Sequence, residues 1–113
     1  MNSVNFNQLV PGRTLIAAAV AAILLAACTA APPRPVGAAE ARGKLTQLQS
    51  NPDLANRAPL AVKEADAAVR AAEQPEADRE LGAHRVYMAD RKVEIARAQA
   101  ETSLAEDQRS TLS

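Results

Sequence analysis

Three prolines divide the chain beyond residue 37 into segments with the periodicity of an α-helix. They stand in the pairs Asn51-Pro52, Ala58-Pro59 and Gln74-Pro75. Proline interrupts a helix because it lacks an amide proton and its ring clashes with the preceding turn, and it disfavours helical geometry in the residue before it. It fits the first turn of a following helix well. The prolines therefore predict successive helices joined by short turns.

The first two segments each carry one apolar line along a helical face. Residues three and four positions apart lie on the same side of a helix. In the first segment, residues 38–50, the line consists of Ala38, Ala41, Leu45 and Leu48. In the second, which follows Pro59, it consists of Val62, Ala65, Val69 and Ala72. We expect both lines to face a common core.

The third segment, about residues 76–110, carries two apolar lines, and we expect Pro75 in its first turn. The first line, named here the alanine stripe, is Val86, Ala89, Val93, Ala96 and Ala100. The second, the Leu–Met–Ile stripe, is Leu81, Met88 and Ile95, about 120° away around the helix. The charged residues Asp90, Glu94, Arg97 and Glu101 occupy the remaining side, which we expect to face solvent. Two stripes predict a long helix packed against two neighbours, one on each stripe.

Most residues on these lines are alanine, which sets a limit on the core. Small side chains allow helices to approach closely, but burying a Val, Leu or Ile side chain contributes about 1.5–3 kcal/mol and few are available. The predicted fold is all-α: a helical hairpin or small three-helix bundle with a long C-terminal helix. It would occupy residues 38–110, with a tail at 111–113 and self-association as a way to complete the core.

Residues 1–27 have the layout of a secretory signal peptide. Arg13 is their only ionisable side chain, and an apolar run over residues 14–25 follows it. A basic start, a short apolar region and small residues before the cleavage site are typical of such leaders. The alternative is an uncleaved membrane anchor, but this run is shorter than the roughly 20 apolar residues of a spanning helix.

The end of this run matches the lipobox of bacterial lipoproteins. Leu25, Ala26 and Ala27 precede Cys28, the only cysteine of the chain. The motif predicts cleavage before Cys28 and lipidation of its thiol, which would hold the protein on a membrane; the alternative is a free thiol after an ordinary signal peptide. A lone cysteine excludes a disulfide within the chain. In the lipoprotein pathway, aspartate after the cysteine favours retention in the inner membrane, and Thr29 leaves the route to the periplasmic face of the outer membrane open.

Residues 28–37 join the lipidated cysteine to the first helix. Three of the four residues from Pro32 to Pro35 are prolines. Such a segment favours extended polyproline geometry and acts as a semi-rigid spacer. We expect it to hold the folded part clear of the lipid headgroups.

The chemistry of residues 28–113 argues against catalysis and against nucleic acid. Their 12 basic and 13 acidic side chains balance, whereas nucleic-acid binding needs a basic face. His84 is the only histidine; with Glu80 one turn away it could share a metal, but a surface histidine is the simpler interpretation because zinc takes three or four ligands. Tyr87, the only aromatic residue after the leader, could anchor an interface or lie along the bundle with its hydroxyl in water. We therefore expect neither enzymatic activity nor a bound cofactor.

Several blocks of the sequence resemble a bacterial lipoprotein family, the domain of unknown function 4398. They are Asn51-Pro52-Asp53-Leu54-Ala55, Ala58-Pro59-Leu60-Ala61, Ala65, Gly82-Ala83-His84, Tyr87, Ala89-Asp90-Arg91 and Glu94-Ile95-Ala96. The resemblance covers about residues 37–105. It implies an exported, helical lipoprotein region that often precedes an OmpA-like domain binding peptidoglycan. That domain would begin beyond residue 113, so we do not expect peptidoglycan binding here.

Together these features predict a non-enzymatic lipoprotein of the cell envelope with a small helical interaction or structural module. Its partners would be the membrane, through the lipid, and another envelope protein or copies of itself. His84, Val86, Tyr87, Val93 and Ile95 are the candidate interaction residues. The alternative is a shortened member of the family of OmpA-like peptidoglycan tethers, and a metal carrier or enzyme is a more distant one.

Overall fold

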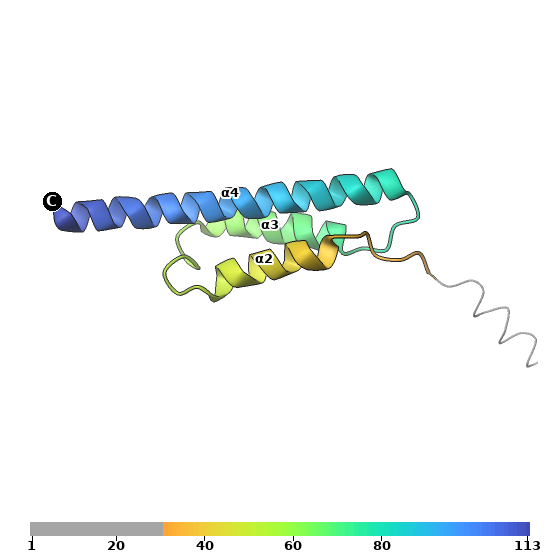
Figure 1. Cartoon of the computed structure of the whole chain (residues 1–113), viewed down its shortest axis with the longest axis horizontal. Coiled ribbons are helices and arrows are strands. Elements are labelled where there is room, and N and C mark those ends of the chain that lie inside the picture. The colour runs from red at the N-terminus through yellow and green to blue at the C-terminus, as the bar shows by residue number, and fades with distance from the viewer. Residues whose placement is uncertain (1–30) are drawn as a thin grey trace, which may run out of the picture. The chain divides into compact units, whose positions relative to one another are not determined.

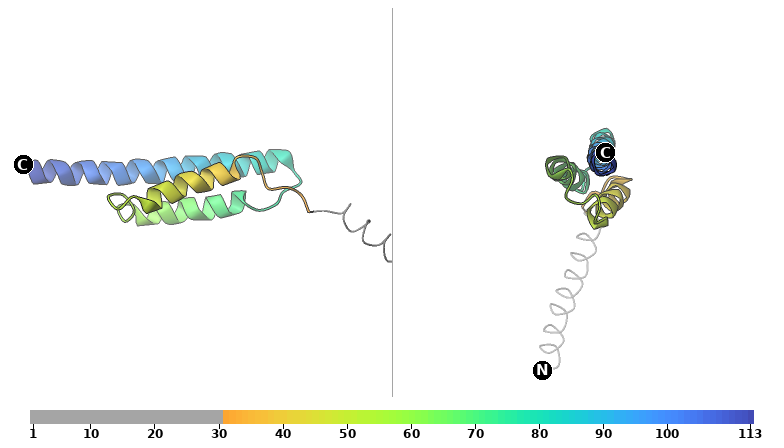
Figure 2. Two further views of the ribbon diagram at one scale, coloured as in Figure 1. Left: turned by 60° about the horizontal axis from the view of Figure 1, so that its bottom comes forward. Right: turned by 90° about the vertical axis from the view of Figure 1, so that its left-hand side faces the viewer.

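The computed structural model describes residues 31–113, and there the chain forms three helices and no strand. They are α2 (Ala38–Ser50), α3 (Pro59–Ala72) and α4 (Arg79–Leu112). The helices lie side by side and form a triangle when viewed along their axes (Figures 1 and 2). The predicted all-α fold with a long C-terminal helix is confirmed, in its three-helix form. None of the described helices is long and apolar enough to span a membrane.

Local chemistry accounts for the helix boundaries. Pro59 occupies the first turn of α3, as predicted. Pro75 does not begin α4; the helix starts at Arg79, because the carboxylate of Asp78 accepts hydrogen bonds from the backbone amides of Glu80 (3.0 Å) and Leu81 (3.1 Å). An aspartate cap satisfies amides that have no partner within the helix. At its other end α4 continues through Leu112, beyond the expected limit at residue 110.

The core is built from the predicted lines of small residues. All four residues of the α2 line are buried, as are Ala65, Val69 and Ala72 of the α3 line, while Val62 is partly buried. The largest fully buried side chains are Leu45, Leu48, Val69 and Val93. Among residues 31–113 only these four large side chains reach full burial, which confirms that the core of the bundle is thin and consists mainly of alanine.

Only one of the two stripes on α4 faces this core. Ala89, Val93, Ala96 and Ala100 are at most 1% exposed and Val86 is partly buried, so the whole alanine stripe packs inward. In the Leu–Met–Ile stripe, by contrast, Leu81, Met88 and Ile95 are 39%, 38% and 46% exposed. The prediction that each stripe meets its own neighbour is therefore wrong. Both neighbouring helices share the alanine stripe, since its small side chains let two helices approach the same line.

Two ion pairs place these neighbours on either side of the alanine stripe. Lys44 of α2 binds Asp90 (3.2 Å), and Glu64 of α3 binds Lys92 (3.4 Å). Asp90 and Lys92 lie about 160° apart around α4. Asp90, expected on a solvated side, is therefore a half-buried contact to α2.

The proline-rich segment packs on the end of the bundle. The carbonyl of Pro33 accepts a hydrogen bond from the amide of Glu76 (3.3 Å), and the ring of Pro35 lies so close to Gly82 that a Cβ there would be 3.1 Å from it. At Gly37 the backbone turns into α2 with a φ of 94°, a conformation that favours glycine. From Pro33 onward, the segment expected to act as a semi-rigid spacer therefore packs against Glu76 and the first turn of α4.

Candidate functional site

The Leu–Met–Ile stripe is the most extended apolar feature on the described surface of α4. Its members are spaced by seven residues, so Leu81 and Ile95 are about 21 Å apart along the helix. Each side chain exposes between 38% and 46% of its surface, which leaves the stripe half-embedded between neighbouring side chains. Three half-exposed apolar side chains aligned on one face are a candidate contact surface, whereas single exposed apolar residues are ordinary.

Cations border this stripe on both sides. Arg85 and Lys92 lie on the side toward α3, where they bind Glu76 (3.0 Å) and Glu64 (3.4 Å). Arg91 lies on the other side and binds Glu94 at 2.8 Å. Because long basic side chains keep their charge in water while their stems cover apolar surface, the stripe has an amphipathic border.

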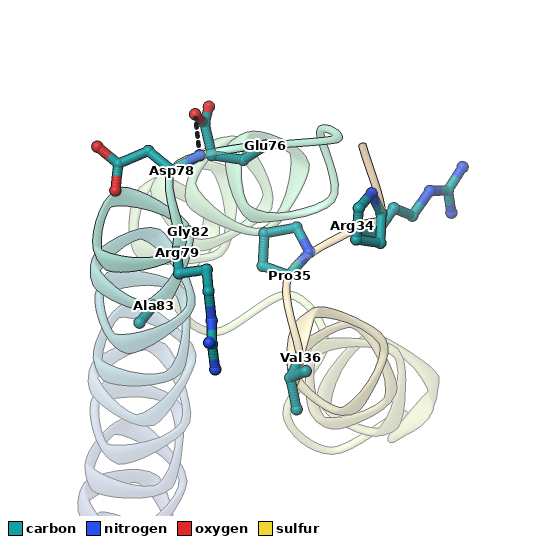
Figure 3. A pocket seen from close by; sticks show the side chains of 9 residues that line it. Arg34, Pro35, Val36, Glu76, Asp78, Arg79, Gly82 and Ala83 are labelled. Carbon is teal, nitrogen blue, oxygen red and sulfur yellow. Dashed lines mark hydrogen bonds between the residues drawn. The ribbon is translucent and has the colours of Figure 1, made fainter. Parts of the chain in front are cut away.

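A shallow recess of about 300 Å³ lies where the proline-rich segment crosses the first turn of α4 (Figure 3). Pro35 and Gly82 form its floor, and the charged ends of Arg34, Glu76 and Arg79 point in different directions. Charged groups that do not converge on a common point cannot position a substrate for acid–base or nucleophilic chemistry. We therefore interpret the recess as the place where the proline-rich segment packs against α4, and not as a substrate site.

The strongest charge cluster joins α2 to α3. Arg42 donates hydrogen bonds to Glu73 (2.6 and 3.1 Å) and to Asp66 (2.9 Å). These bonds from Arg42 hold the pKa of both carboxyls below their ordinary values, and in turn they raise the pKa of Arg42. Each charge has a partner, so the cluster fastens the two helices together. Sequence reasoning missed it because it joins residues 24 and 31 positions apart.

The structure separates the candidate interaction residues into two groups. Val93 is buried and Val86 packs against the core, so neither presents a surface to a partner. Ile95, His84 and Tyr87 are exposed, Tyr87 by 59%. Ile95 belongs to the Leu–Met–Ile stripe and His84 lies beside it, whereas Tyr87 lies about 100° away around α4 from Met88.

Two predicted sites remain: the lipidation site, which lies outside residues 31–113, and the pair Glu80 and His84, which lies within them. Cys28 and the lipobox residues Leu25, Ala26 and Ala27 lie outside the described residues. Glu80 and His84 are both exposed on the first turns of α4. Within residues 31–113, no group of three or more His, Cys, Asp or Glu side chains is arranged to hold a metal ion.

Within residues 31–113, fold and surface together define a three-helix bundle with an exposed apolar stripe on α4 and a docked proline-rich segment. Residues 38–112 match the family described as Domain of unknown function (DUF4398). Because the match covers most of the chain, the protein belongs to this family, as the resemblance indicated. No curated protein and no solved structure matches the sequence.

Proposed function

We propose that this protein is a lipid-anchored component of the bacterial cell envelope whose helical bundle acts by contact and not by catalysis. The observation that carries the proposal is the run Leu25-Ala26-Ala27 before Cys28, the only cysteine of the chain, after a basic residue and an apolar region. Diacylglycerol on the thiol and an acyl chain on the new amino terminus would anchor it, since two or more chains give lasting membrane attachment.

The described surface supports a contact function. Three of the seven large apolar side chains that are exposed among residues 31–113 lie in line on one face of α4, as the Leu–Met–Ile stripe. The charged groups of the Arg42 cluster, by contrast, are paired with one another within the fold. Thr29 after the cysteine supports transfer to the outer membrane, so the proposed place of the bundle is the periplasmic face of that membrane.

Metabolic labelling with palmitate tests the anchor. Wild-type protein should incorporate label and lose residues 1–27, and it should sediment with outer-membrane vesicles in a density gradient. Cys28→Ser should remain unlabelled and accumulate as the longer precursor, because the thiol that accepts the lipid is gone. Label in the Cys28→Ser protein, or an unlabelled wild type, would refute the proposal.

A further inference from the structure

The Leu–Met–Ile stripe begins at the end of the bundle where the proline-rich segment is attached. Leu81 adjoins Gly82, and the ring of Pro35 packs on Gly82. The carbonyl of Pro33 is held by the amide of Glu76, so the chain is fixed to the bundle from Pro33 onward. An anchor attached to the chain before Pro33 would therefore keep Leu81, the first residue of the stripe, close to that anchor.

The length of the preceding segment sets how far the bundle can stand from its anchor. This step rests on the proposed lipidation of Cys28. Cys28 and Pro33 are five positions apart, and even a fully extended chain spans at most about 18 Å between them. Interfacial helices bury their apolar face roughly 5–10 Å into the boundary between headgroups and acyl chains. The stripe is therefore within reach of the same bilayer, at the high effective concentration that a short connection provides.

The charges beside the stripe suit a lipid surface better than a second copy of the chain. In the structure Arg85, Arg91 and Lys92 each form an ion pair with a glutamate. Ion pairs near the surface contribute only about 0–1 kcal/mol, so these long side chains can exchange the glutamate for a lipid phosphate while their stems lie on apolar surface. Two copies paired antiparallel about Met88 would instead set Arg85 of one against Arg91 of the other. A parallel pair would set each of these cations close to its own equivalent, which is also repulsive.

We propose that α4 docks through Leu81, Met88 and Ile95 on the headgroup region of the membrane that carries its lipid anchor. The bundle then lies along the bilayer instead of standing away from it on a spacer. The segment between Cys28 and Pro33 is short enough to favour this arrangement, and the cations on both sides of the stripe meet the lipid phosphates.

The test uses the mature chain, residues 28–113, with Cys28→Ser and a histidine tag placed before residue 28. Nickel-chelating lipid in vesicles of phosphatidylethanolamine and phosphatidylglycerol then replaces the native anchor, so the result is independent of whether Cys28 is lipidated. A single cysteine introduced by Met88→Cys carries an environment-sensitive fluorophore. Gln47→Cys, on an exposed position of α2, is the matched control.

The label at position 88 should shift its emission to shorter wavelength on the vesicles, and nitroxide-bearing lipids should quench it. The control label should do neither. Adding Ile95→Ser should reduce the ratio of docked to undocked chain at least about fourfold, the factor for one buried methylene. Equal solvent exposure of both labels on the vesicles would overturn the proposal. An emission shift at position 88 that rises with protein concentration without vesicles would also overturn it, because a second copy would then cover the stripe.

Discussion

Aspartate substitutions at Val93 and Ile95 should affect stability very differently, although the two residues lie within one turn of the same helix. Val93 is 1% exposed and Ile95 is 46% exposed. Val93→Asp removes a buried side chain that contributes about 1.5–3 kcal/mol and leaves an unpaired carboxylate in the core, at a further cost of about 3–5 kcal/mol. The 82 residues from Pro32 to Ser113 would have a total stability of about 4–12 kcal/mol, with a thin core favouring the lower part of that range.

Val93→Asp should therefore abolish cooperative unfolding of the mature chain, as followed by circular dichroism at 222 nm during heating. Ile95→Asp loses only about half of the burial of one side chain, about 1 kcal/mol, which corresponds to a fall in Tm of about 4–8 °C. Glu94→Ala is the control, because its ion pair with Arg91 is exposed and contributes less than about 1 kcal/mol. If Ile95→Asp unfolded the chain as completely as Val93→Asp, the assignment of the two stripes would be wrong.

Two further predictions concern the ion cluster and the glycines. Because Arg42 lowers the pKa of Asp66 and Glu73 in the folded state, the stability gained is present above their unfolded pKa of about 4 and is lost as the pH falls through the lowered values. The Tm should thus fall steeply below about pH 4.5 in wild type and less steeply in Arg42→Gln; equal slopes would contradict this. Gly43 has open space where a Cβ would lie, so Gly43→Ala should stabilise the chain by about 0.5–1 kcal/mol in urea titrations. Gly82→Ala brings a methyl group to 3.1 Å from the docked proline ring, so it should stabilise the chain less than Gly43→Ala does and should speed proteolysis before residue 37. Equal gains in stability for the two substitutions would refute the docking of the proline-rich segment.

The amino-acid sequence was sufficient to predict the three helices and the inward faces of α2 and α3. Proline positions separate the helical segments because proline acts locally on the backbone, within a residue or two. The buried lines of α2 and α3 follow from the 3.6-residue period, which is also a local property. The lipobox before Cys28 is likewise a short contiguous motif, so the proposed anchor depends on no tertiary contact.

Only the tertiary structure decided which stripe of α4 is buried. Periodicity identifies two apolar lines but does not say where neighbouring helices lie around them. The ion pairs of Asp90 with Lys44 and of Lys92 with Glu64 place both neighbours about the alanine stripe, whose small side chains permit close approach. The Leu–Met–Ile stripe remains exposed because a third neighbour is not present among the described helices.

The docking of the proline-rich segment was also beyond sequence reasoning. A run of prolines predicts extended backbone whether it is free or packed, because its geometry is set by the ring itself. The contact of Pro35 with Gly82 joins positions 47 residues apart, and it exists only because glycine leaves room on the first turns of α4. Local backbone preference thus fixed the shape of the segment, and long-range packing fixed its place on the bundle.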